Sequence, residues 1–227
     1  MNYKTLSRFW KNNSLVIVLF TVFALTLIGM SIAGYKASNA EHVDRRQPTE
    51  SYISYITSGD FVEGVFENWE SEFLQMWALV VLTIWLRQKG ADDSKPLRGK
   101  TPQDTKSRYS WARATTLDKK LRWARHFIYS HSLGMTAFII FLAAFILHAA
   151  GGATVYNQDA EYYGSQDRVN LVTYMGTSQF WYESLQNWQS EFLAVGALMV
   201  LSIKLRERGS PESKPVGKRY DRQTGSG

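Results

Sequence analysis

The sequence predicts an all-α fold, an integral membrane four-helix bundle made of two tandem, parallel helical-hairpin repeats. Three observations carry this prediction: a motif that occurs twice, a set of long uncharged segments, and an uneven distribution of Lys and Arg. The mean hydropathy of the chain, −0.24, would by itself suggest a soluble protein. That average hides strong segregation, because apolar residues gather in a few segments and charged residues lie between them.

A seven-residue motif shows the duplication most clearly. Asn-Trp-Glu-Ser-Glu-Phe-Leu at residues 68–74 returns as Asn-Trp-Gln-Ser-Glu-Phe-Leu at residues 187–193, which is 119 positions later. The same offset relates Ser-Lys-Pro at residues 94–96 to Ser-Lys-Pro at residues 213–215. A constant offset between several matches indicates an internal repeat, and repeats determine the architecture.

The matches divide the chain into four parts. We place the first repeat at residues 1–99 and the second at residues 126–215. A basic linker at residues 100–125 joins them, and residues 216–227 form a tail. Because residues 91–107 and 210–227 are polar and contain Pro, Gly, Ser, Lys and Asp, we expect them to be flexible.

Each repeat opens with an apolar helix. Residues 15–33 and 132–147 contain no charged residue, and a membrane-spanning helix needs roughly 20 mainly apolar residues. The first segment follows Lys4, Arg8 and Lys11 and so resembles a secretory signal. It is longer than the apolar core of about 7–15 residues in such signals. Since its counterpart lies mid-chain, we expect the helix to be retained.

The second helix of each repeat is less apolar. Residues 73–86 and 192–203 are uncharged, and they reach spanning length only if they extend backward through Glu72 and Glu191. We therefore predict four transmembrane helices, at about residues 14–34, 67–87, 132–150 and 186–205.

Signals for helix ends flank this second helix. Thr-Ser pairs at residues 57–58 and 177–178 have the side chains of N-cap residues. Gly90 and Gly209 stand where a helix-terminating glycine is expected, after basic residues of the last turn. These features predict where the helices begin and end.

Basic residues predict the orientation. The N-terminal arm, the middle loop from Arg87 to Arg125 and the C-terminal segment from Lys204 together hold 22 of the 26 Lys and Arg residues, and the other two loops hold four. Loops rich in Lys and Arg stay on the cytoplasmic side. We therefore expect cytoplasmic N- and C-termini, and two hairpins that share one orientation.

The candidate site lies on a polar face of the second helix in each repeat. Its residues are identical in the two repeats and follow the i, i+3, i+4 spacing of one helix face. They are Asn68, Ser71 and Glu72 in the first repeat, and Asn187, Ser190 and Glu191 in the second.

Three interpretations of this polar face stay open. An ionisable residue within a membrane span is costly and is a functional candidate by default, so Glu72 and Glu191 could form a proton or cation site. Alternatively, the polar side chains hydrogen-bond neighbouring helices and hold the bundle together. A third interpretation places Glu72 at the membrane interface, in contact with water.

A separate acidic stripe is not shared between the repeats. Glu63, Glu67 and Glu70 form it, whereas the second repeat has Tyr182, Gln186 and Gln189 at these positions. We expect this stripe to be a solvated acidic face.

The residue types argue against enzyme chemistry. The chain has no cysteine, which excludes disulfides, thiol catalysis and thiolate metal sites. His131 and His148 fall in one helix and are separated by roughly 25 Å, so they cannot bind one metal ion or haem. We find no phosphate-binding loop and no HExxH motif. We therefore expect no enzyme activity, no cofactor and no metal site.

The end of the middle loop has the pattern of an interfacial helix. Residues 117–128 carry an apolar face with basic residues elsewhere, which is typical of a helix that lies on anionic lipid headgroups. We expect the basic charge to bind the cytoplasmic lipid surface and no nucleic acid.

The doubled Asn-Trp-x-Ser-Glu-Phe-Leu motif, followed by an apolar helix, a basic end and Gly-x-x-x-Ser-Lys-Pro, resembles an uncharacterised family of small bacterial four-helix membrane proteins. The resemblance covers essentially the whole chain and implies a location in the bacterial inner membrane. It implies no activity. We therefore expect a non-enzymatic structural or accessory membrane component, with a homo-oligomer or a membrane protein as partner. The alternative is a small proton or cation channel or transporter that uses Glu72 and Glu191.

Overall fold

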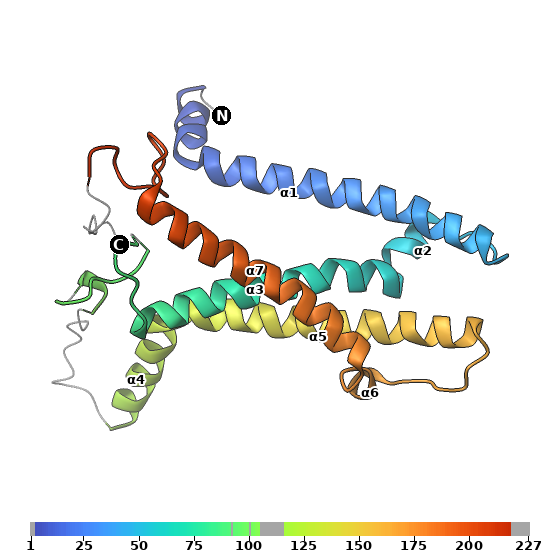
Figure 1. The fold of residues 1–227 in the computed structure, drawn as a ribbon. Helices are drawn as coiled ribbons and strands as arrows, with labels where there is room; N and C mark the ends of the chain where they lie inside the picture. The colour runs from blue at the N-terminus through green and yellow to red at the C-terminus, as the bar shows by residue number, and fades with distance from the viewer. Residues whose placement is uncertain (1–2, 92, 100, 105–115, 219–227) are drawn as a thin grey trace. The chain divides into compact units, whose positions relative to one another are not determined.

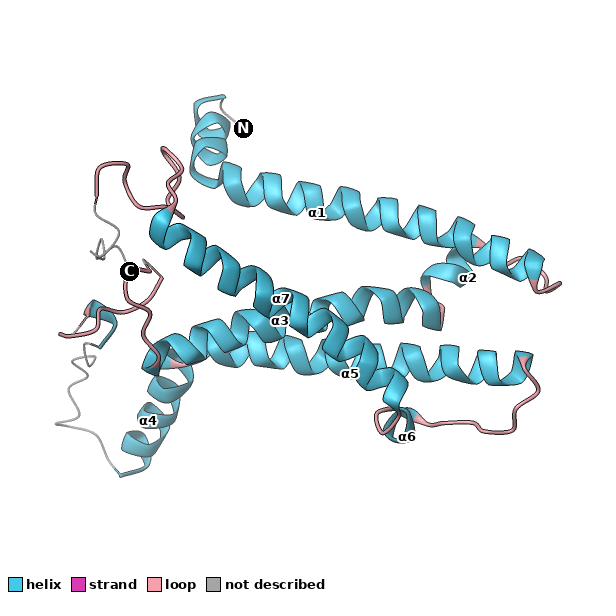
Figure 2. Cartoon of the chain, viewed as in Figure 1, coloured by secondary structure: helices cyan, strands magenta, loops and turns pink. Residues whose placement is uncertain are grey.

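The computed structural model describes residues 3–91, 93–99, 101–104 and 116–218, and its regular structure is helical (Figure 1). Figure 2 shows no strand in these residues, so the all-α prediction is confirmed for them. Much of the predicted linker and tail lies outside the described residues. In chain order the elements are α1 (Tyr3–Asp44), α2 (Tyr52–Ile56), α3 (Gly59–Trp85), the 3₁₀ turn η1 (Pro102–Asp104), α4 (Thr116–Ser130), α5 (Ser132–Tyr162), α6 (Leu171–Tyr174) and α7 (Ser178–Lys204).

Two helices of the described chain, α1 and α5, are long and apolar enough to cross a membrane. The qualifying segments are Ser7–Asp44 and Ser132–Tyr162, and the 18-residue windows within them have mean hydropathies of 2.7 and 2.2. Both are longer than the predicted spans of residues 14–34 and 132–150. At a rise of 1.5 Å per residue they measure about 57 and 46 Å, against a hydrocarbon core of roughly 30 Å. Each helix is therefore long enough to cross a bilayer and to extend beyond its hydrocarbon core.

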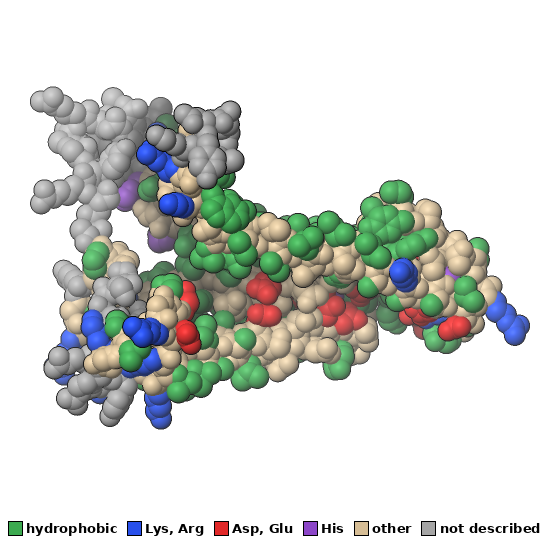
Figure 3. Space-filling view, turned by 90° about the horizontal axis from the view of Figure 1, so that it is seen from above, with side chains coloured by type: hydrophobic (Ala, Val, Ile, Leu, Met, Phe, Trp, Pro, Cys, Tyr) green, Lys and Arg blue, Asp and Glu red, His purple; other side chains and the backbone are tan. Residues whose placement is uncertain are grey.

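The surface of α1 is unusually apolar. Leu15, Phe20 and Leu25 are among its exposed large hydrophobic residues, and hydrophobic side chains are prominent on the face of the molecule seen in Figure 3. Exposed apolar surface of this extent marks a region that contacts lipid or protein. The pattern favours association of α1 with a membrane.

Side-chain oxygens begin α3 and α7 at equivalent positions. Ser58 Oγ accepts a hydrogen bond from the Phe61 amide at 3.3 Å, and Thr177 Oγ1 accepts one from the Phe180 amide at 3.2 Å. The predicted N-caps are thereby confirmed. Each helix has 27 residues and begins eight residues before the span predicted for it, because the cap lies well ahead of the apolar segment.

An arginine closes the last turn of each of these helices. Arg87 Nη1 donates to the carbonyl oxygens of Thr83 and Ile84 at 3.3 and 3.0 Å. Arg206 Nη1 makes the same two bonds at the equivalent positions of α7, at 3.2 and 3.1 Å. The guanidinium groups thus satisfy carbonyls that have no partner inside the helix.

The prediction that Gly90 and Gly209 terminate these helices is wrong. The helices end at Trp85 and Lys204, five residues before the glycines, once the arginines have capped the carbonyls. With φ angles of 86° and 89°, the glycines shape the following turn instead. The serine of each Ser-Lys-Pro motif then accepts a hydrogen bond from the amide six positions earlier, at 2.7 and 2.8 Å.

The chain divides into two compact units, which we describe separately. Unit 1 consists of Met1–Gly64 and Gly151–Arg168, and unit 2 consists of Val65–Ala150 and Val169–Gly227. Both α3 and α5 contribute residues to each unit. Each unit therefore draws on both predicted repeats.

In unit 1, tyrosines join α1 to α2. The ring of Tyr35 lies edge-on to that of Tyr52, with centroids 5.6 Å apart, and also contacts Tyr55 at 6.2 Å. The hydroxyl groups of Ser31 and Tyr52 share a hydrogen bond of 2.7 Å. Offset and edge-on aromatic pairs of this kind stabilise a contact beyond the area that they bury.

A glycine brings α3 and α5 into backbone contact within unit 1. A Cβ atom at Gly151 would lie 2.5 Å from the backbone nitrogen of Glu63 and 2.9 Å from the carbonyl oxygen of Gly59. Because these neighbours are backbone atoms, they cannot move aside as a flexible side chain would. Small residues at such crossings are the usual means of close helix packing in membranes.

We expect Gly151→Ala to destabilise the folded protein by about 1–3 kcal/mol, because the added methyl group forces the helices apart. Gly29→Ala is the matched control in α1, where a Cβ atom would meet nothing within 4 Å. Unfolding of both variants by denaturant in detergent micelles measures the difference. Equal stability of the two variants would contradict the close crossing.

Candidate functional site

A buried carboxylate joins three helices in unit 2. Glu70 of α3 has no exposed surface. Its Oε2 atom lies 2.8 Å from Nδ1 of His148 on α5, and its Oε1 atom accepts a hydrogen bond of 2.8 Å from Nε1 of Trp188 on α7. Each carboxylate oxygen therefore has a partner on a different helix.

The sequence of α5 explains why His148 reaches this place. Ala137, Phe141, Ala144 and His148 are all buried and follow the i, i+4, i+7, i+11 spacing of one helix face. The two alanines leave room for a neighbouring helix to approach. His148 is the polar member of this buried face and has 0% of its surface exposed.

A second carboxylate faces the other side of the imidazole. Glu183 Oε2 on α7 lies 3.5 Å from His148 Nε2, and it accepts a 2.8 Å hydrogen bond from the hydroxyl group of Tyr174. The other oxygen of Glu183 accepts a hydrogen bond from Gln179 at 2.5 Å. Tyr174 is buried, whereas Gln179 is exposed. We call Glu70, His148, Glu183, Tyr174 and Trp188 the buried array.

Aromatic rings enclose the buried array. The ring of Phe180 packs on His148 with centroids 5.0 Å apart, and Phe145 packs on Phe180 at 5.1 Å and on Trp188 at 6.4 Å. Ser184, one turn after Phe180, is fully buried, and its hydroxyl group has no hydrogen-bond partner among the residues that the structure describes. The polar groups therefore lie in an apolar surrounding, where electrostatic interactions are stronger than in water.

The sequence-predicted site residues are divided between buried and exposed positions. Ser71 is buried, and Asn187 and Glu191 are half-buried. Asn68, Glu72 and Ser190 are exposed. The two serines each donate to the carbonyl oxygen three residues earlier, at 2.8 Å.

One member of the predicted set makes a contact beside the buried array. The Asn187 side chain donates to Glu67 Oε1 at 2.5 Å, which links α7 to α3. Glu72 on α3 is exposed and Glu191 on α7 is half-buried, so neither lies in the core of unit 2.

The predicted solvated acidic stripe is wrong for Glu70, which is the most deeply buried of the acids. Sequence reasoning missed the pairing because His148 lies 78 residues further along the chain. The available signal was His148 itself, an ionisable residue within an apolar helix. Glu183 and Tyr174 gave no signal, because they lie in a polar segment.

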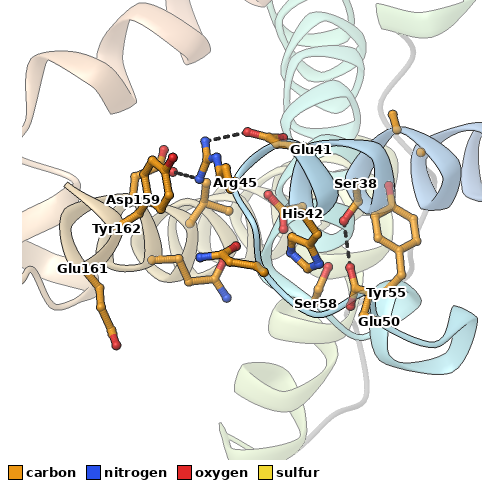
Figure 4. Close-up of a pocket in the computed structure, with 16 residues that line it drawn as sticks. Ser38, Glu41, His42, Arg45, Glu50, Tyr55, Ser58, Asp159, Glu161 and Tyr162 are labelled. Atoms are coloured by element: carbon orange, nitrogen blue, oxygen red, sulfur yellow. Dashed lines mark hydrogen bonds and ion pairs between the residues drawn. The ribbon is translucent and has the colours of Figure 1, made fainter.

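Unit 1 contains a cavity of about 720 Å³, and five of its 16 lining residues are acidic (Figure 4). Arg45 lies in it between two acids, 2.5 Å from Glu41 and 2.7 Å from Asp159, and its guanidinium stacks over the Tyr162 ring at 4.8 Å. The hydrogen bond to Asp159 raises the pKa of Arg45. Partial burial raises the pKa of Asp60, with the nearby acids adding to the effect.

The chain belongs to the DUF6766 family, a domain of unknown function, which matches residues 6–226. The match spans nearly the whole chain, consistent with the uncharacterised family expected from the sequence. No curated protein and no solved structure matches the chain.

We expect Asp60→Asn to be more stable than the unaltered protein at pH 7. Because the folded-state pKa of Asp60 is raised, ionisation opposes folding above that pKa, and the penalty disappears as the pH falls below the unfolded value of about 3.9. The Asp60 side chain also has exposed surface, so we expect the substitution to increase the free energy of unfolding by less than about 1 kcal/mol. Denaturant unfolding at pH 7 and pH 4 measures the difference in stability between Asp60→Asn and the unaltered protein, with the exposed Asp167→Asn as control. The same difference at both pH values would contradict the raised pKa of Asp60.

Proposed function

We propose that the protein is a multi-pass integral membrane component with a structural or accessory role and no enzyme activity. In this proposal α1, α3, α5 and α7 cross the inner membrane of a bacterium, with both termini in the cytoplasm. The observation that carries it is Glu70, whose buried carboxylate binds side chains of two other helices. Such a bond is a means of holding helices together where water is absent.

The duplication supports the four-helix arrangement. The N-caps of α3 and α7, the arginine caps and the Ser-Lys-Pro turns occur at equivalent positions in the two halves. Because α1 and α5 each have the apolar length to span a bilayer, the helix that follows each can return the chain to its starting side. Two hairpins fused in tandem would then share one orientation.

The proposed partners follow from charge. Arg125 and the exposed apolar residue Leu121 lie on α4, a combination that suits a helix at the surface of anionic lipids. We propose that α4 lies along the cytoplasmic face of the membrane. A second copy of the chain or another membrane protein would cover the remaining apolar surface.

A second candidate function is a proton or cation pathway through Glu72 and Glu191. The occurrence of a glutamate at the same position of both repeats favours it, because ionisable residues within membrane spans are functional candidates by default. Proton or cation flux into proteoliposomes that is lost in the Glu72→Gln/Glu191→Gln double variant would support this candidate. Absence of flux with the unaltered protein would exclude it.

Cysteine labelling tests the membrane topology directly, because the natural chain contains no cysteine. We expect Thr101→Cys and Gly217→Cys to be protected from an impermeant maleimide in intact spheroplasts, since positive charge retains these segments in the cytoplasm. Gln166→Cys should be labelled. All three should react after the membrane is permeabilised. Labelling of Gly217→Cys without labelling of Gln166→Cys in intact cells would contradict the proposed orientation.

A further inference from the structure

We propose that the buried array is a proton-binding site, in which His148 takes up and releases a proton through Glu183. The inference concerns unit 2 alone. It goes beyond the structural role proposed above and depends on that role only for the side of the membrane from which the proton comes.

The two nitrogens of His148 are in different situations. Nδ1 lies 2.8 Å from Glu70, so it carries a hydrogen and donates it to that carboxylate. Nε2 is buried without a hydrogen-bond partner in the described residues, and it faces a carboxylate oxygen of Glu183 at 3.5 Å. In the neutral ring Nε2 is an acceptor, so two acceptors then face each other.

One added proton resolves this conflict. When Nε2 is protonated, it donates toward Glu183 while Nδ1 keeps its bond to Glu70, and the imidazolium lies between two carboxylates. Helix assembly alone does not require this arrangement, because Glu70 already joins the three helices through Nδ1 and Trp188. The second carboxylate is therefore the feature that points to proton exchange.

Within unit 2, the charged and titratable groups around His148 come from three elements. Glu67 and Glu70 lie on the α3 side, and Glu183 lies on the α7 side. Tyr174, at the end of α6, reaches the same Glu183 oxygen at 2.8 Å. The ring therefore lies among three carboxylates and one phenol of this unit.

Glu183 also provides a route to the surface. Its side chain is 17% exposed, whereas those of Glu70 and His148 are fully buried. It is bonded to the exposed Gln179 as well. A proton taken up by the Glu183 carboxylate moves to Nε2, which leaves Glu183 ionised and the ring positively charged. Because Glu70 has no exposed surface, the site opens on the Glu183 side.

Nitrogen NMR of the full chain in lipid nanodiscs tests the proposal. Labelling histidine with ¹⁵N gives signals from four rings, and those missing in His148→Gln belong to His148. We expect both nitrogens of His148 to carry a proton at low pH, and Nε2 to lose its proton reversibly as the pH rises toward 10. In Glu183→Gln the ring should bind the proton at least tenfold more weakly.

Two controls make the outcome specific. Glu161→Gln, at an exposed acid outside unit 2, should leave the titration of His148 unchanged. Tyr174→Phe removes a donor to Glu183 but no carboxylate, so Nε2 should still titrate. A His148 ring that keeps one protonation state from pH 4 to pH 10 would overturn the proposal, as would an identical titration in Glu183→Gln. These results stand apart from the membrane topology, which the labelling of cysteines measures separately.

Discussion

The Glu70 carboxylate is the interaction on which unit 2 depends. It is fully buried, and it bonds to His148 on α5 and to Trp188 on α7. A buried charge costs several kcal/mol unless it is paired and hydrogen-bonded. Separating α5 or α7 would take away one of its two partners, and separating α3 would leave His148 and Trp188 without the carboxylate. The polar contacts thus specify which helices meet, and the aromatic rings around them fill the remaining space.

The two repeats have diverged at this point. Glu70 corresponds to Gln189 in the second repeat. In the first helices Ser-Leu at residues 14–15 matches Ser-Leu at residues 132–133, an offset of 118, so His148 corresponds to Met30. The buried pair therefore takes its acid from the first repeat and its base from the second. A fused duplication can form this pair once, whereas a symmetric dimer of identical hairpins would form the same pair twice.

Local features of the fold were predictable from the sequence, and long-range features were not. The serine and threonine caps of α3 and α7 act on amides three residues away, so the residue types alone located both helix starts. The buried array joins residues 78 and 118 positions apart, and no local pattern encodes that pairing. Comparing the repeats even pointed away from it, because identity between the copies favoured Glu72 over Glu70. The early start of α3 and α7 followed from the caps, whereas the apolar segments alone gave helices that were too short.

A double-mutant cycle tests the central interaction most directly. The free energies of unfolding of Glu70→Ala, His148→Ala and the double variant would be measured in detergent micelles under matched conditions. The account predicts a coupling energy of about 1–3 kcal/mol between the two positions, because each single variant strands a buried polar partner. Effects that add to within about 0.5 kcal/mol would contradict it, since independent sites add in this way.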